Sequence, residues 1–204
     1  TVDDVMDEVR EQAERDYQLA SGLSQDVETD DSVLRQTSAR LPWLLIGMLG
    51  GIGNSMILGN FDTTFAAHPE MALYIPLIGG TGGNVGTQSS ALVVQGLANS
   101  SLDANNTWKQ ILKESVVALI NATIISMLVY IYNFVRFGPT ATVSYSVSLS
   151  LFAVVMFASI FGTLVPMTLE KLKIDPAIAT GPFISITNDI IGMMLYMGIT
   201  VLLS

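Results

Sequence analysis

The chain has 204 residues, of which half are hydrophobic and only 13% are charged, against about 25% charged residues in soluble globular domains. Its net charge is −9, and it has no basic stripe that could neutralise phosphates, which excludes nucleic-acid binding. The lack of Cys excludes a disulfide framework, a thiolate nucleophile and a soft-metal site. This composition favours a membrane protein without nucleic-acid partners.

The charges divide the chain into an acidic arm and an apolar remainder. Residues 1–40 hold eleven of the eighteen acids and four Arg, whereas residues 41–204 hold seven acids and five bases. We therefore predict two regions: a polar acidic arm over 1–40 and a membrane domain over 41–204.

Apolar residues recur in the arm at three- and four-residue steps from Val2 to Tyr17, which predicts an amphipathic helix. Gly22 ends this pattern, and a polar linker follows. The helix is either a solvated surface element or a regulatory element whose acids bind divalent cations at a pore mouth. Because the chain opens inside this helix without Met, we expect other domains to precede it in the natural protein.

Five hydrophobic stretches follow the arm, and each approaches or exceeds the roughly 20 residues that cross a membrane as a helix. They run from Leu41 to Leu58, Met71 to Leu97, Ile111 to Val135, Val147 to Leu169 and Ile178 to Leu203. The sequence thus predicts an all-α membrane protein with five transmembrane helices. An odd number of spans puts the two termini on opposite sides of the membrane.

The basic residues near the spans predict the orientation. One set of flanks carries Arg35, Arg40, Lys109, Lys113, Lys171 and Lys173, and the other set carries only Arg136. Since Lys and Arg accumulate on the cytoplasmic side, we expect a multi-pass protein of the cell membrane with a cytoplasmic N-terminus and an external C-terminus.

The second predicted span contains the glycine-rich sequence PLIGGTGGNVGTQSS, from Pro76 to Ser90. Its five Gly within eight residues would each cost a soluble helix about 1 kcal/mol relative to Ala, so packing or function must require them. The glycines either allow close helix packing or permit unwinding beside a water-filled cavity. The polar neighbours favour the cavity, and Gly80, Gly83, Asn84 and Thr87 are our candidate pore-lining residues on this span.

Asp189 lies near the middle of the fifth span, which is otherwise uncharged. A charge at the centre of a membrane helix costs about 2.5 to 3.5 kcal/mol on insertion scales, so such a residue is a candidate ion site. Helical stepping places Gly181 and Ser185 on the face of Asp189, with Asn188 beside it. We predict Asp189 as the metal ligand and these three neighbours as pore-lining residues.

The chemistry of this predicted site favours a hard divalent cation. Carboxylate, carbonyl and water oxygens suit Mg²⁺, Ca²⁺ or Mn²⁺, whereas Zn²⁺ and Cu prefer imidazole and thiolate ligands. One acid per chain offsets too little of a divalent charge, and two chains around a two-fold axis would bring two Asp189 carboxylates together. Mg²⁺ releases its water reluctantly, so a wide polar site that contacts a hydrated ion is reasonable.

Other acids suggest structural or surface roles. Glu114 and Glu170 are expected near the membrane interfaces, and Lys113 beside Glu114 supports that interpretation. Asp175 precedes Pro176 and is expected to cap a helix. An intramembrane aspartyl protease needs a second membrane-embedded acid; none is predicted, so we do not expect an enzyme. An ion-coupled carrier or exchanger that uses Asp189 remains the alternative to a channel.

Three sequence segments together resemble the transmembrane domain of the MgtE magnesium channels. They are Pro76 to Ala98, the triplet Asp175-Pro176-Ala177, and the sequence GPFISITND from Gly181 to Asp189. The likeness extends from Leu41-Pro42-Trp43-Leu44 to the end of the chain. It departs from the family at Gln95, where many relatives have Arg, and at Ser185 and Gly181, where some have Ala and Asn.

The resemblance implies a homodimer with five spans per chain and a pore on the two-fold axis between the second and fifth helices. The aspartate that matches Asp189 would hold Mg²⁺, the transported ion, with Ser185 and Gly181 on its helix face and Asn84 and nearby glycines opposite. Full-length members carry a cytoplasmic N-domain and a paired CBS module, and an acidic connecting helix joins these to the pore. Residues 1–22 resemble the end of that helix.

Overall fold

The computed structural model describes residues 2–24, 26–99, 101–102, 107–138, 141–179 and 181–203, and these ranges contain helices but no strand. The α-helices are α1 (Val2–Ala20), α2 (Val33–Gly59), α3 (Asp62–Ala67), α4 (Ile75–Ala98), α5 (Thr107–Phe137), α6 (Thr142–Lys171) and α7 (Pro182–Leu203). Two 3₁₀ helices, η1 (Pro69–Tyr74) and η3 (Pro176–Ala179), connect them. The predicted all-α class is confirmed.

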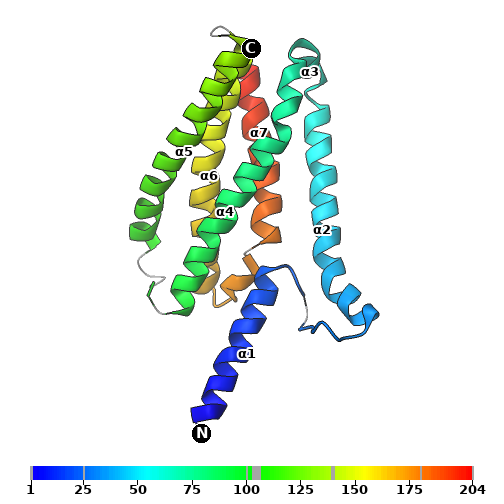
Figure 1. The fold of residues 1–204 in the computed structure, drawn as a ribbon, viewed down its shortest axis with the longest axis vertical. Helices are drawn as coiled ribbons and strands as arrows, with labels where there is room; N and C mark the ends of the chain where they lie inside the picture. Colours follow the sequence, from blue (N-terminus) through cyan, green and yellow to red (C-terminus); the bar gives the residue numbers. More distant parts are fainter. Residues whose placement is uncertain are drawn as a thin grey trace.

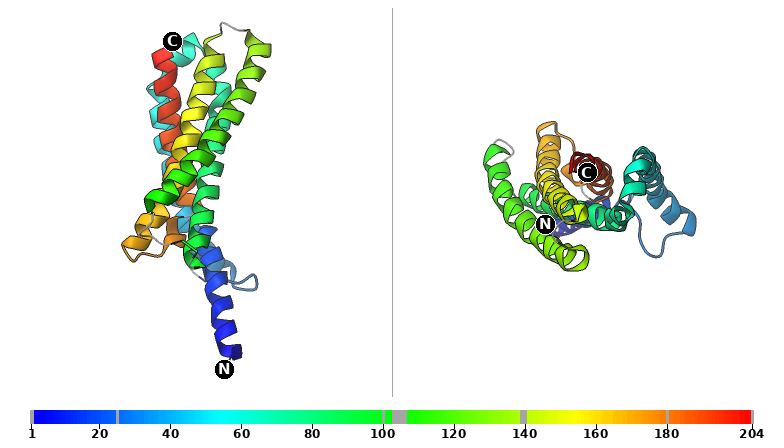
Figure 2. Two further views of the ribbon diagram at one scale, coloured as in Figure 1. Left: turned by 90° about the vertical axis from the view of Figure 1, so that its left-hand side faces the viewer. Right: turned by 90° about the horizontal axis from the view of Figure 1, so that it is seen from above.

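Five long helices run alternately up and down: α2, α4, α5, α6 and α7 (Figure 1). The two termini lie at opposite ends, and α1 extends away from the bundle along its long axis (Figure 2). Four of the five helices, α2, α5, α6 and α7, are long and apolar enough to cross a membrane. The chain is therefore a multi-pass membrane protein, and the crossing by α4 stays a prediction.

Helix α6 is the centre of the bundle, with α5, α4 and α7 packed around it. Its contacts with α4 and α7 depend on small residues. The backbone of Gly162 on α6 lies directly against the carbonyl of Gly86 on α4, and Gly82 and Gly192 both face the side chain of Val154. Small residues at these points let the helix backbones approach closely, which is how helices associate in a membrane.

The glycine-rich segment stays helical throughout α4, so close packing rather than unwinding explains it. Gly82, Gly83 and Gly86 are buried on the face toward α6 and α7. Gly80 and Asn84 lie on the opposite, exposed face. The segment thus has one face for packing and one small, polar face that no described residue covers.

The short connections are set by local hydrogen bonds. Gly22 has a positive φ of 82°, and the N–H groups of Gly22 and Leu23 donate to carbonyls of the last turn of α1, which is the Schellman arrangement that favours Gly. Ser32 caps α2, its hydroxyl accepting from the N–H of Arg35. Because α2 begins at Val33, it starts before the predicted first span, and the predicted boundary between residues 40 and 41 lies inside it.

Candidate functional site

Asp189 faces a cavity of about 300 Å³ between α2, α4 and α7. Asp189 itself is half-buried. The cavity is lined by Asn54 from α2, by Ile75, Pro76, Gly79, Gly80, Gly83 and Asn84 from α4, and by Ser185, Asp189 and Met193 from α7. A carboxylate, two carboxamides and a hydroxyl therefore share one space with the glycine face of α4.

Glycines of α4 form the wall opposite the carboxylate because side chains would not fit there. A Cβ atom at Gly79 would lie 3.3 Å from the Asp189 Oδ1 atom. A Cβ atom at Gly83 would lie 2.9 Å from the Ser185 Oγ atom and 3.7 Å from Asp189 Oδ1. A larger residue at Gly79 would push into the carboxylate, and one at Gly83 would push into the Ser185 hydroxyl. This face of α4 therefore keeps the space around Asp189 open.

The structure brings together five of the eight predicted site residues. Asp189, Ser185, Gly80, Gly83 and Asn84 all line the cavity. Their role in binding an ion stays a prediction.

The other three predicted residues lie elsewhere. The Thr87 hydroxyl donates to the Gly83 carbonyl oxygen at 2.9 Å, within its own helix. Gly181 has a φ of 55° and lies against the Ala20 carbonyl at the end of α1. Asn188 is 1% exposed and packs against Gly86. Its amide atoms have no hydrogen-bond partner among the described residues.

Sequence reasoning missed Asn54 and Met193, which also line the cavity. Met193 follows Asp189 by one helical turn on α7. Asn54 follows a short glycine sequence in α2, a weaker version of the one in α4. Its Oδ1 atom is buried without a hydrogen-bond partner in the described part of the chain, which leaves an oxygen available to a ligand.

The donor set suits a cation that keeps much of its water. Apart from the Met193 thioether, every side-chain ligand atom that lines the cavity is an oxygen or an amide nitrogen, which favours hard cations. Across the described ranges no group of three or more His, Cys, Asp or Glu residues could hold a metal ion. A bare divalent ion would be poorly neutralised by one carboxylate, whereas a hydrated one can be bound through its water shell.

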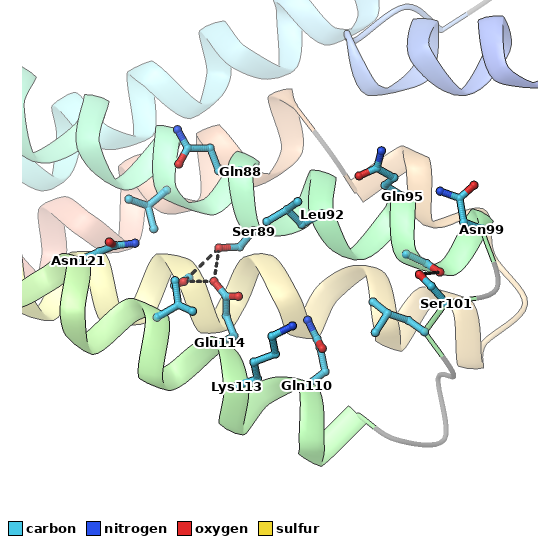
Figure 3. Close-up of a pocket in the computed structure, with 15 residues that line it drawn as sticks. Gln88, Ser89, Leu92, Gln95, Asn99, Ser101, Gln110, Lys113, Glu114 and Asn121 are labelled. Carbon is cyan, nitrogen blue, oxygen red and sulfur yellow. Dashed lines mark hydrogen bonds between the residues drawn. The ribbon is translucent and has the colours of Figure 1, made fainter.

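Glu114 corrects a prediction about the other acids. It was expected to be exposed at a membrane interface, and the expected exposure is wrong, because the residue is only 9% exposed. The Ser89 hydroxyl donates to Glu114 Oε1 at 2.7 Å, and Ser159 donates to the same oxygen. Figure 3 shows this cluster between α4, α5 and α6. The partners come from 25 and 45 residues away, so local sequence did not reveal the burial.

This buried acid also changes the argument against an aspartyl protease. That class was set aside because no second embedded acid was recognised, and Glu114 removes this reason. The residues that line the Glu114 cavity and those that line the Asp189 cavity do not overlap. The two carboxylates therefore cannot share the acid and base work that the paired mechanism requires.

A bundle of apolar helices around a polar cavity with one carboxylate defines a multi-pass helical membrane protein. Residues 75–199 match the family model of MgtE, described as a divalent cation transporter. The match covers more than half of the chain, and the chain belongs to the MgtE family.

Three curated relatives support this assignment, and each is named magnesium transporter MgtE. The proteins of Bacillus subtilis (strain 168) and Enterococcus faecalis are 32% and 30% identical over 199 residues, or 98% of the chain. The protein of Thermus thermophilus is 32% identical over 209 residues, covering 100% of the chain. The chain spans 44% to 45% of the length of these relatives.

Proposed function

We propose that this chain conducts Mg²⁺ across the cell membrane as a selective channel, with Asp189 as its central ion-binding carboxylate. The observation that carries the proposal is the cavity in which Asp189 faces the glycine wall of α4. An ion beside Asp189 would meet the Ser185 hydroxyl on α7 and glycines on the facing wall of α4. The naming of three relatives as magnesium transporters makes Mg²⁺ the first ion to test.

The pore would lie on the two-fold axis of a homodimer. A single Asp189 gives a divalent ion one negative charge, and a second copy would supply another. The uncovered face of α4 with Gly80 and Asn84 is small and polar, as expected for a surface that meets water and a partner rather than lipid. In this arrangement α4 is the fifth crossing, shielded from lipid by its neighbours and the second chain.

The positions of the basic residues support a cytoplasmic N-terminus. Arg35 and Arg40 begin α2, Lys109 and Lys113 begin α5, and Lys171 ends α6. The antiparallel order of the helices puts all of these at the end of the bundle that carries α1 (Figure 1). Arg136 ends α5 at the opposite end. The positive-inside rule then places α1 in the cytoplasm and the C-terminus outside.

An ion-coupled carrier or exchanger is the alternative, since a mid-membrane carboxylate can also exchange a proton for a metal ion. Flux assays in proteoliposomes separate the two. With the wild-type chain, we expect Mg²⁺ uptake down its own gradient, less uptake of Ca²⁺ and Na⁺, and no change when a proton gradient is imposed. Uptake that requires the proton gradient would establish the carrier, and the absence of any Mg²⁺ uptake would contradict both.

A further inference from the structure

The Glu114 cluster contains three oxygen atoms that lie within hydrogen-bond distance of one another. The Ser89 Oγ atom is 2.7 Å from Glu114 Oε1 and 3.0 Å from Ser159 Oγ, and Ser159 also donates to Glu114 Oε1. Each hydroxyl has one proton, and an ionised carboxylate takes both of them. No proton is then left between the two serine oxygens, which face each other with lone pairs only. These lone pairs and the carboxylate charge together attract a further positive charge.

A polar cavity of about 480 Å³ adjoins this cluster. Gln110, Lys113 and Asn121 of α5 line it together with Glu114 and the two serines. In Figure 3 the dashed lines join only one Glu114 oxygen to the serines, and Gln110 and Lys113 are drawn among the residues that line the same cavity. A water molecule occupies about 30 Å³ in the liquid, so the cavity has room for an ion together with several waters.

We propose that Glu114, Ser89 and Ser159 form a second site, which binds a hydrated divalent cation. The free Glu114 oxygen and the serine lone pairs supply hard oxygen ligands, which suit Mg²⁺ or Mn²⁺. The waters on the cavity side complete the coordination that Mg²⁺ prefers to keep. The site shares no lining residue with the Asp189 cavity, so it can bind a cation whether or not the proposed channel conducts.

Lys113 sets the affinity of this site. Its ammonium group lines the same cavity, but no ion pair joins it to Glu114 in the described part of the chain. A fixed positive charge near an ionised carboxylate partly neutralises it and repels an incoming cation. Replacing Lys113 with a neutral residue of similar length should therefore strengthen cation binding, whereas a site for an anionic headgroup would be weakened.

The absence of Cys from the chain allows a direct test with one introduced thiol. Asn121→Cys places the thiol in the cavity, and Ile124→Cys places it on an exposed apolar part of α5 as the control. Both are made in an Asp189→Asn background, so that the first cavity does not contribute. The purified chain is treated with an uncharged, water-soluble methanethiosulfonate, with and without Mg²⁺ at constant ionic strength.

We expect the Asn121→Cys thiol to react readily and the Ile124→Cys thiol to react slowly in liposomes. Mg²⁺ should slow the reaction of Asn121→Cys several-fold. Adding Glu114→Gln should remove this protection, and adding Lys113→Gln should shift it to lower Mg²⁺ concentration. Size-exclusion chromatography checks the fold of each variant. If Glu114→Gln does not fold, the Lys113→Gln shift decides the outcome alone.

Three results would overturn the proposal. One is a thiol at Asn121→Cys that reacts no faster than the control, because the cavity would then not be hydrated. Another is a failure of the predicted Mg²⁺ effect. This would be a modification rate of Asn121→Cys that does not change with Mg²⁺, or protection by Mg²⁺ that is unchanged or weaker after Lys113→Gln. The third is protection that follows pH and not Mg²⁺, which would assign the positive charge to a proton.

Discussion

Asp189 and Glu114 both lie on helices that are apolar enough to cross a membrane, yet their surroundings differ in kind. Asp189 faces the glycine backbone of α4 across an open cavity, and its carboxylate accepts no side-chain hydrogen bond from the described residues. Glu114 is held on one oxygen by two serines from two other helices. The comparison teaches that a carboxylate without hydrogen bonds from the protein, such as Asp189, is available to bind an ion. A carboxylate that accepts hydrogen bonds from two other helices, as Glu114 does, also stabilises the packing of those helices.

The largest expected effect is on transport after Asp189→Asn. Because the proposed role of this charge is to bind the ion and not to support the packing, we expect Mg²⁺ uptake to fall below roughly a tenth of the wild-type rate. Glu170→Gln, which removes a charge from an exposed position, is the control and should leave uptake unchanged. Stopped-flow measurement of Mg²⁺ entry into proteoliposomes checks this. Normal uptake by a folded Asp189→Asn protein would contradict the ion-binding role.

Leu substitutions in the glycine wall of α4 should reduce Mg²⁺ uptake almost as strongly as Asp189→Asn. Two positions in this wall should differ in the effect of the substitution on stability. A side chain at Gly83 meets Ser185, whereas a Cβ atom at Gly80 meets no atom within 4 Å. We expect Gly83→Leu to lose uptake and also about 1–3 kcal/mol of stability through overpacking. Gly80→Leu should fold normally and still lose uptake, since its side chain fills the mouth of the cavity.

Gly51→Leu on α2 is the matched control, because no atom lies within 4 Å of a Cβ atom there either. It should leave both uptake and the thermal unfolding temperature near the wild-type values. Normal uptake by Gly80→Leu would show that the uncovered face of α4 does not lie on the ion path.

A smaller effect is expected on stability when Glu114 loses a serine. Ser159→Ala removes a hydroxyl that donates to a buried carboxylate, and hydrogen bonds to charged groups contribute about 1.5–3 kcal/mol. The thermal unfolding temperature should fall by several degrees, with a smaller effect on uptake than Asp189→Asn has. Ser115→Ala, which removes a hydroxyl bonded within α5, is the control. An equal fall in both variants would show that the Glu114 network adds no special stability.

The smallest expected effect concerns the acids of α1, all of which are exposed except the half-buried Asp16. They differ in this from the half-buried Asp189 and the buried Glu114. They can attract Mg²⁺ to the end of the bundle only weakly, because charges in water are screened by salt within about 10 Å at 0.1 M. We expect the opening of the proposed channel in the 204-residue chain to change little with cytoplasmic Mg²⁺. Patch recordings over a range of concentrations check this. Steep inhibition of opening by millimolar cytoplasmic Mg²⁺ would show that a Mg²⁺ sensor lies within the 204 residues of this chain.

The sequence predicted the helices better than it predicted the contacts between them. Hydrophobic length located the long helices, and the isolation of Asp189 singled out the residue that faces the cavity. The start of α2 was placed at Leu41 instead of Val33, because the polar first turns after the Ser32 cap carry no hydrophobic signal. Asn188 was predicted to line the pore as the neighbour of Asp189, although adjacent residues on a helix point about 100° apart.

Glu114 shows why the rest could not be predicted. Its neighbour Lys113 favoured a position at the membrane interface, and the serines that bind it belong to distant parts of the chain. One signal was available within α5 itself. Gln110, Glu114 and Asn121 recur at helical spacing in a largely apolar segment, and polar residues on one face of a membrane helix indicate a polar neighbour.

The low hydropathy of helix α4 affects how the protein inserts into the membrane during synthesis. Helix α4 is not among the helices that hydropathy alone would insert, since its glycines and amides give little favourable transfer to lipid. Its neighbours α5 and α6 are strongly apolar, and α4 packs closely on α6 through Gly86 and Gly162. We therefore expect α4 to be retained in the bilayer only once α5 and α6 have left the ribosome, so that biogenesis depends on the order in which the helices emerge.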